Sequence, residues 1–290
     1  MNRSDESARD GGRPMIAAVA FDLDDTLAES KTPISTTMAD LLVRLGRLVP
    51  VCIISGGRFE QFRDQVVRLL PPADPALESL HLMPTCGTRY YRHTAGEWRQ
   101  IYADDLTPEE KRDAIEAIET AAKGLGMWEP DEIVTGDRIE DRGSQITFSA
   151  LGQRAEVARK KTWDPDGAKR HVLRDRVQRA LPALEVRAGG STSIDITRKG
   201  IDKAYGIRHF ATAIEVDLGS ILFVGDRLDP GGNDAPVIGL GVQTHAVRDC
   251  RETESLLPRL ISALQNGSGE AWSGDGHGTC GHDGGLSPGR

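Results

Sequence analysis

Residues 16–27 read Ile-Ala-Ala-Val-Ala-Phe-Asp-Leu-Asp-Asp-Thr-Leu, an apolar run of strand length followed by three carboxylates within four residues. Negative charge at the end of a buried strand is costly to fold unless a cation or a charged ligand compensates it. Open α/β sheets bind ligands at the carboxyl ends of their parallel strands. An acidic turn or a helix cap is the alternative interpretation of Asp-x-Asp. The order of apolar strand, Asp-x-Asp-x-Thr-Leu and helix-like stretch favours a metal-assisted site.

Strand-like and helix-like segments alternate on the C-terminal side of this stretch, and the same alternation returns near the end of the chain. Apolar residues at helical spacing predict helices, and short β-branched runs predict strands. The predicted helices cover 34–48, 59–70, 202–213 and 252–264, and the predicted strands cover 16–21, 49–54, 80–83 and 220–224. This rhythm predicts an α/β fold with a Rossmann-like doubly wound parallel-sheet core.

The middle of the chain has a different texture, with strand signals at 98–102, 133–149 and 194–197 and helix signals at 108–123 and 166–180. We therefore predict an inserted α+β cap domain. The expected division is a core of residues 14–88 and 191–265, a cap of residues 89–190, and disordered ends at 1–13 and 266–290.

The composition narrows the class of protein. The 290 residues carry a formal net charge of −8, and no basic stripe indicates a nucleic-acid partner. No apolar stretch has the length of a membrane span, and the first residues resemble no signal sequence, so a cytoplasmic location is expected. The four cysteines are scattered and predict neither a disulfide frame nor a zinc site.

Polar residues that follow predicted strands or begin a predicted helix form one candidate site. They are Asp22, Asp24, Ser55, Lys203, Asp226, Asn233 and Asp234. Such a set suits phosphoryl transfer, which needs a nucleophile in line with the phosphorus and positive charge near the phosphate. Carboxylates with an Asn suit Mg²⁺, and the candidate ligands are Asp22, Asp24, Asp226, Asn233 and Asp234. Ser55 and the backbone N–H groups of Gly56 and Gly57 are expected to hold phosphate oxygens, although Ser55 has a helix cap as its alternative role.

These motifs, over about residues 16–88 and 185–250, resemble those of the haloacid dehalogenase superfamily of phosphotransferases. The resemblance implies that Asp22 is the nucleophile that becomes an aspartyl-phosphate and that Asp24 is the general acid/base. It also implies that Ser55 and Lys203 are the second- and third-motif residues, with Asp226 and Asp234 as the fourth-motif acids. Mg²⁺ would then be bound by the nucleophile, by the backbone carbonyl at the Asp24 position and by a fourth-motif Asp. Asp25 stands where the common pattern has Gly.

The position of the insert resembles the type IIB cap branch, which includes Cof-like sugar phosphatases and eukaryotic-type phosphomannomutases. The loop Gly-Asp-Arg-Leu-Asp-Pro-Gly-Gly-Asn-Asp at 225–234 looks like that of the phosphomannomutases. So does Gly-Gly-Ser-Thr-Ser-Ile-Asp-Ile at 189–196 followed by Gly-Ile-Asp-Lys at 200–203. This resemblance implies that Ser193 and Asp195 help to bind a sugar phosphate.

Phosphomannomutases hold the non-reacting phosphate with three cap arginines, which bind phosphate by bidentate charge-assisted bonds. Arg142 matches the first of these. The second position falls at Gln153, next to Arg154, and the third at Lys160 or its neighbour Arg159. A solvated charged face is the alternative interpretation of these cap residues.

We expect a Mg²⁺-dependent phosphatase that acts on a small phosphorylated sugar, because loss of a charged clamp favours hydrolysis. The alternative is a phosphomannomutase that interconverts mannose 1-phosphate and mannose 6-phosphate, which the loop at 225–234 favours. A non-catalytic sugar-phosphate-binding module is a third reading, against which the intact set of acids argues. No GxGxxG follows the first strand, which argues against a dinucleotide-binding oxidoreductase. A homodimer formed through the cap is a further expectation.

Overall fold

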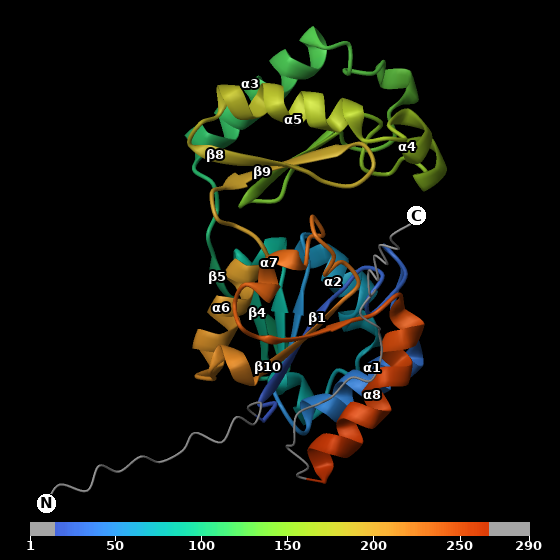
Figure 1. Ribbon diagram of the computed structural model, residues 1–290, viewed down its shortest axis with the longest axis vertical. Helices are drawn as coiled ribbons and strands as arrows, with labels where there is room; N and C mark the ends of the chain where they lie inside the picture. Colours follow the sequence, from blue (N-terminus) through green and yellow to red (C-terminus); the bar gives the residue numbers. More distant parts are fainter. Residues whose placement is uncertain (1–14, 267–290) are drawn as a thin grey trace, which may run out of the picture.

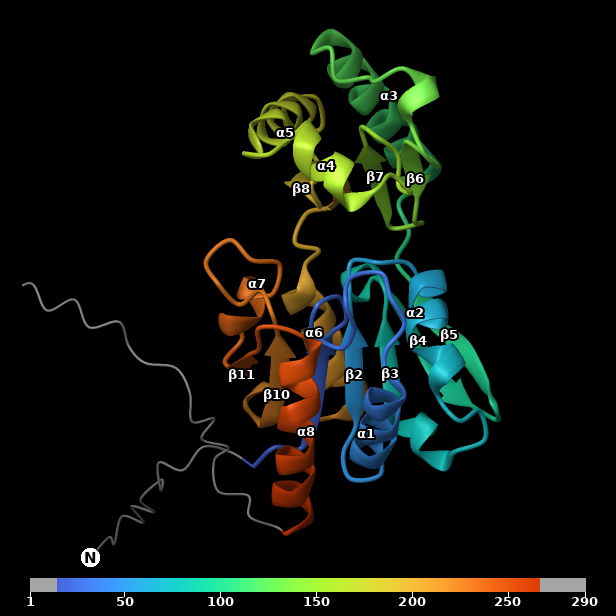
Figure 2. The same cartoon turned by 90° about the vertical axis from the view of Figure 1, so that its right-hand side faces the viewer.

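The computed structural model describes residues 15–266, which form two β-sheets, each with its own helices (Figures 1 and 2). The larger sheet has seven strands in the order β11-β10-β1-β2-β3-β4-β5. These strands are β1 (Ala18–Asp22), β2 (Val51–Ile54), β3 (Leu80–Met83), β4 (Arg89–Thr94), β5 (Glu97–Ala103), β10 (Ile221–Gly225) and β11 (Gln243–Ala246). The first five strands of the order are parallel. The predicted α/β class is confirmed.

Helices cover both faces of this sheet because alternate residues of its central strand are apolar on both sides. Val19 and Phe21 belong to the core under α1 and α8, whereas Ala18 and Ala20 belong to the core under α6. The helices are α1 (Thr36–Gly46), α2 (Phe59–Gln65), α6 (Lys203–Ile214), α7 (Ala235–Ile238) and α8 (Cys250–Gln265). Ser35, Asp202 and Asp249 cap α1, α6 and α8 through their side chains. The 3₁₀ helices are Val67–Leu69, Pro75–Ser79, Thr85–Gly87, Asp131–Ile133 and Leu218–Ser220.

The sheet is not purely parallel, because β4 and β5 form an antiparallel hairpin beside β3. The hairpin turns at Ala95 and Gly96, whose φ angles are 53° and 84°. Two consecutive positive φ values match the tight turn whose twist suits a two-residue hairpin. The expectation of an all-parallel core is thus corrected at one edge. Helix α2 also stops before the predicted end at residue 70 and is followed by the 3₁₀ turn at 67–69.

The second sheet has four antiparallel strands in the order β6-β7-β9-β8, and we call residues 104–202 the cap. Its strands are β6 (Ile139–Asp141), β7 (Gln145–Ser149), β8 (Leu184–Ala188) and β9 (Ser193–Arg198), and its helices are α3 (Pro108–Gly124), α4 (Val157–Trp163) and α5 (Ala168–Ala180). Ile146, Phe148, Ile194 and Ile196 pack in one apolar cluster with residues of α3 and α5. The opposite face of the sheet is turned toward the seven-stranded sheet (Figures 1 and 2).

The pairing of the strands places both boundaries of the insert at positions different from those predicted. Residues 89–103 extend the core sheet instead of beginning the insert, and β9 pairs with β7 and β8 instead of returning to the core. Arg198 joins the two connections between the sheets, because its guanidinium contacts Asp104 at 2.6 Å and Glu110 at 2.9 Å. The predicted disordered ends, residues 1–13 and 266–290, lie outside the described residues apart from residue 266.

Within residues 15–266, none of the helices has the length and apolar character needed to cross a membrane. The three described cysteines, Cys52, Cys86 and Cys250, are free thiols.

Candidate active site

Lys203 lies between two carboxylates at the carboxyl ends of adjacent strands. Its Nζ is 2.5 Å from Asp22 Oδ1 at the end of β1 and 2.5 Å from Asp234 Oδ1 in the loop after β10. All three side chains are buried, with exposed fractions of 1%, 4% and 0% respectively. Lys203 begins α6, and Asp202 caps that helix by accepting a hydrogen bond from the backbone N–H of Tyr205. The helix start therefore delivers the ammonium to the edge of the sheet.

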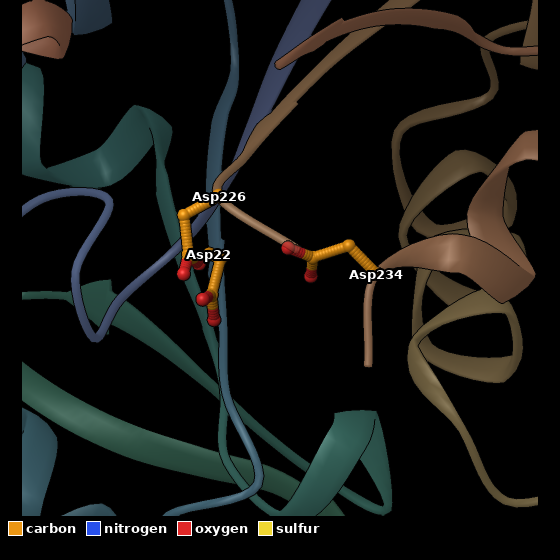
Figure 3. Close-up of side chains that lie close together, drawn as sticks. All are labelled: Asp22, Asp226 and Asp234. Carbon is orange, nitrogen blue, oxygen red and sulfur yellow. The ribbon is translucent and has the colours of Figure 1, made fainter. Parts of the chain in front are cut away.

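Asp226 completes a cluster of three carboxylates with Asp22 and Asp234, whose ligand oxygens lie within 4.8 Å of one another (Figure 3). The close approach depends on Gly225, because a Cβ atom at that position would be 2.4 Å from Asp234 Oδ2. Three carboxylates facing one ammonium carry an excess of negative charge. Oxygen ligands with this excess fit a hard divalent cation such as Mg²⁺.

Burial opposes ionisation of Asp22 and Asp226, and repulsion from Asp234 adds to this effect. Burial raises the pKa of Asp22 to about 7, with Lys203 opposing the shift and Asp234 adding to it. Burial also raises the pKa of Asp226 above its usual range. Burial alone would lower the pKa of Lys203, but Asp22 and Asp234 raise it above its usual value. Additional positive charge at the cluster would favour the ionised carboxylates.

Ser55 follows β2 and is buried, but it does not cap the next helix. Its Oγ accepts a hydrogen bond from the backbone N–H of Gly57 at 3.1 Å. The N-cap of α2 is Arg58, which has no side-chain capping bond. Among residues 15–266, no acceptor takes the hydroxyl hydrogen of Ser55, so this hydrogen can be donated to a ligand, as phosphate binding requires.

The carboxylate of Asp24 is not part of the three-carboxylate cluster. Its Oδ2 accepts a hydrogen bond from Gln61 Nε2 at 2.8 Å, and its Oδ1 accepts one from the backbone N–H of Lys31 at 2.8 Å. Buried Gln65 also donates to Oδ1, at 3.4 Å. The prediction of this side chain as a metal ligand is therefore not supported by its position, because α2 and the loop before α1 hold it elsewhere. The acid/base role and the backbone carbonyl as a ligand stay predictions.

Asn233 was another predicted metal ligand, and its residue is exposed in the loop after β10. Its neighbour Asp234 is buried because its Oδ2 accepts the backbone N–H of Arg227 at 3.0 Å, which folds the loop back on itself. The role of Asn233 stays a prediction.

The cap contacts the core through Arg142. Its Nη1 donates to the backbone carbonyl of Gly56 at 3.1 Å, so this predicted substrate residue lies beside the loop after β2. Glu140 binds the same guanidinium at 2.7 Å and also contacts Arg58 of the core at 3.2 Å. Sequence reasoning missed Glu140 and Arg58, because only the packing of the cap on the core brings them together.

The other cap residues that we predict to bind the second phosphate differ in their surroundings. Gln153 Nε2 is buried without a hydrogen-bond partner among the described residues. Lys160 Nζ donates to the carbonyl of Gln153 at 3.0 Å. Burial lowers the pKa of Lys160 to about 8, and repulsion from Lys31 of the core contributes to this shift. Arg154 is exposed, and its stem lies against Gly136.

Ser193 and Asp195 lie on β9 of the cap and are half-buried. Burial is the main cause that raises the pKa of the Cys86 thiol, while Lys203 lowers it and Asp195 raises it. Cys86 therefore lies near both the ammonium of the carboxylate cluster and the carboxylate of Asp195. Asp195 thus lies close enough to the core to affect the Cys86 thiol, and its role in binding substrate stays a prediction.

Comparisons with known proteins agree with this architecture. A family model described as eukaryotic phosphomannomutase matches residues 38–261. A phosphomannomutase of Encephalitozoon cuniculi is 27% identical over 222 residues, which cover 74% of this chain and 81% of that protein. Among solved structures, an IMP-nucleotidase of Plasmodium falciparum aligns with a TM-score of 0.62 at 12% identity, covering 86% of this chain and 68% of that one. A haloacid dehalogenase-like hydrolase of Bacteroides thetaiotaomicron aligns with a TM-score of 0.55 at 14% identity, covering 84% and 99%.

Proposed function

The chain belongs to the eukaryotic phosphomannomutase family, and from this premise we propose that it is a Mg²⁺-dependent phosphatase of a small phosphorylated sugar. Membership identifies it as an enzyme of the haloacid dehalogenase type that transfers phosphoryl groups. The fate of the phosphoryl group, the sugar and the metal are the parts that we propose.

In the proposed reaction, a carboxylate oxygen of Asp22 attacks phosphorus, and the bond between phosphorus and the ester oxygen breaks. Asp24 gives a proton to the departing sugar oxygen and then takes one from the water that hydrolyses the aspartyl-phosphate. Lys203 and Ser55 stabilise negative charge on the phosphoryl oxygens. The Asp24 carboxylate accepts hydrogen bonds from Gln61 and from the backbone N–H of Lys31, and it would exchange one of them for the substrate when the substrate binds.

Asp22, Asp226 and Asp234 would hold or orient the Mg²⁺, with Asp24 contributing through its backbone carbonyl. The ion supplies positive charge that offsets repulsion between the phosphate and the carboxylates. The carboxylate cluster supports this assignment, because its charge exceeds what Lys203 compensates.

Our choice of hydrolysis rests on the residues at the three cap positions where phosphomannomutases have arginines. Gln153 has no charge, and the guanidinium of Arg142 is already bound by Glu140 and the Gly56 carbonyl. A mutase must hold a bisphosphorylated intermediate while it turns over in the site, and bidentate Arg contacts are the strongest groups for that purpose. A phosphatase needs no second phosphate site.

Phosphomannomutase activity is the second candidate. It is favoured by family membership and by the loop at 225–234, which brings both Asp226 and Asp234 to the cluster. A non-catalytic binding module is disfavoured, because a binder needs no buried nucleophile beside a lysine.

The test measures free phosphate and phosphate position in one reaction. Purified protein with Mg²⁺ is incubated with mannose 1-phosphate, with and without a hexose bisphosphate, and followed by ³¹P NMR. We expect free phosphate in both cases and at least a 10²-fold loss in Asp22→Asn. Asp25→Asn is the matched control, because Asp25 is an exposed neighbour of the same chemical type and should retain activity.

Formation of the 6-phosphate without free phosphate overturns the choice of hydrolysis in favour of mutase activity. Turnover retained by Asp22→Asn overturns the nucleophile. A cytoplasmic location and a homodimer through the cap remain predictions, which fractionation and sedimentation test.

A further inference from the structure

The cap sheet turns a row of polar side chains toward the core. Glu140, Thr147, Asp195 and Arg187 are register partners across its four strands. The residues that flank Thr147 and Asp195 along their strands, Ile146, Phe148, Ile194 and Ile196, are fully buried in one apolar cluster with residues of the cap helices. Because side chains alternate between the two faces of a strand, the polar row faces the opposite way. Figures 1 and 2 place α3 and α5 on the outer side of this sheet and the core on the other side.

A chain of hydrogen bonds fixes Asp195 within this row. Gln145 Nε2 donates to Thr147 Oγ1 at 2.8 Å, and Thr147 Oγ1 donates to Asp195 Oδ1 at 2.7 Å. A threonine hydroxyl has one hydrogen to donate. The amide of Gln145 acts as the donor to Thr147, so the Thr147 hydrogen is directed at the carboxylate. Thr147 and Gln145 are almost completely buried, with exposed fractions of 2% and 4%.

The second carboxylate oxygen of Asp195 is left for another partner. Among residues 15–266, none donates a hydrogen bond to Oδ2. A Cβ atom at Gly189 would lie 2.8 Å from this oxygen, so the glycine keeps the space beside it open. Asp195 itself is half-buried on the face toward the core. A fixed carboxylate with one free acceptor oxygen suits a donor such as a sugar hydroxyl.

We propose that Thr147, held by Gln145, is a positioning residue that orients Asp195 to accept a hydrogen bond from a ring hydroxyl of the substrate. The inference rests on the proposed function, and it makes the cap selective for polyol phosphates over phosphate esters that lack hydroxyl groups. Thr147 does not touch the reacting atoms, so it acts on substrate binding and not on the chemical step.

Binding is measured by calorimetry in an Asp22→Asn background with Mg²⁺, which separates it from turnover. The ligands are mannose 6-phosphate and phenyl phosphate. Thr147→Val removes the hydroxyl and keeps a β-branched shape. We expect it to weaken mannose 6-phosphate about tenfold and to leave phenyl phosphate within about twofold. Thr147→Ser restores the hydroxyl and should recover the affinity.

Thr192→Val is the matched control. Thr192 is another buried cap threonine, 1% exposed, and its hydroxyl bonds to Ser149 instead of Asp195. It should leave both affinities unchanged. In the active protein, Thr147→Val should raise KM for the sugar phosphate and leave kcat within about twofold.

Equal losses for both ligands, equal effects of the two valine variants, or no preference of the parent for mannose 6-phosphate would each overturn the positioning role. Turnover by Asp22→Asn would contradict the proposed nucleophile instead. The binding preference can therefore be judged even if the proposed reaction fails.

Discussion

Replacing Lys203 with Met tests whether the buried ammonium holds the active site together. The variant keeps a long unbranched side chain but removes the charge that lies 2.5 Å from both Asp22 and Asp234. Removing one partner of a buried ion pair costs about 3–5 kcal/mol, because the remaining charge is buried without compensation. Two carboxylates are left here. We therefore expect Lys203→Met to lower the free energy of unfolding by about 5 kcal/mol at pH 8. This is a large part of the stability of a typical domain, which is about 5–15 kcal/mol.

The measurement is equilibrium unfolding in urea, in EDTA, with Lys111→Met as the matched control. Lys111 makes an ion pair with Asp141 at 2.9 Å, but its side chain is 24% exposed and that of Asp141 is 49% exposed. An exposed pair of this kind contributes about 0–1 kcal/mol. The two Lys→Met substitutions thus remove salt bridges of similar length, one buried and one exposed to solvent.

Conditions that neutralise the carboxylates of Asp22 and Asp234 should reduce the loss of stability caused by Lys203→Met. Because burial raises the pKa of Asp22 to about 7, Asp22 takes up a proton at pH 5, and we expect a smaller loss of stability there than at pH 8. Mg²⁺ should also recover part of the loss at pH 8, because it binds the folded state. A Lys203→Met variant that loses no more than Lys111→Met, or a loss that is the same at both pH values, would refute the electrostatic account of the site.

Two further predictions concern titration. In metal-free protein the pKa of Asp22 is raised to about 7 from an ordinary 3.8, so its contribution to stability is present at low pH and is lost as the pH rises through 7. Urea unfolding in EDTA should show a loss of about 2.5 kcal/mol between pH 5 and pH 8 that Asp22→Asn lacks, and parallel curves would contradict it. Burial and Lys31 lower the pKa of Lys160 to about 8, so KM for a sugar phosphate should rise above pH 8 as the amine loses its charge. Lys160→Arg should keep KM low at pH 9, and identical pH profiles of KM would exclude a contact between Lys160 and the substrate.

The centre of the core could be predicted from the sequence because its signals are local. β1 is a continuous apolar run, and the carboxylate at its end is part of the same twelve residues. The parallel order of the central strands then brings Asp22 and Asp226 to one edge, since Asp22 ends β1 and Asp226 follows the adjacent strand β10. Lys203 joins them because α6 starts at that residue.

The parts that sequence reasoning missed depend on contacts between distant segments. The carboxylate of Asp24 is turned by Gln61 of α2, which no local pattern around Asp24 indicates. Glu140 faces Arg58 only because the cap sheet lies over the loop after β2. The sequence prediction places residues 89–103 in the insert because the texture of the sequence changes near Tyr90. The pairing of β4 with β3 decides that these residues belong to the core sheet.

Glu140 contacts both the cap and the core, and its position bears on whether the enzyme acts as a phosphatase or as a mutase. Its carboxylate contacts the guanidinium groups of Arg142 in the cap and Arg58 in the core, so it links the cap to the loop after β2. A second phosphate would have to displace this carboxylate from Arg142 before it could form bidentate bonds of its own. The displaced carboxylate would then lie beside a like charge, which raises the cost of holding a bisphosphate. A sugar monophosphate with its phosphate at Lys203 requires no such exchange. For this reason, the arrangement around Glu140 supports our proposal that the phosphoryl group is released to water, even in a chain whose relatives carry the name of a mutase.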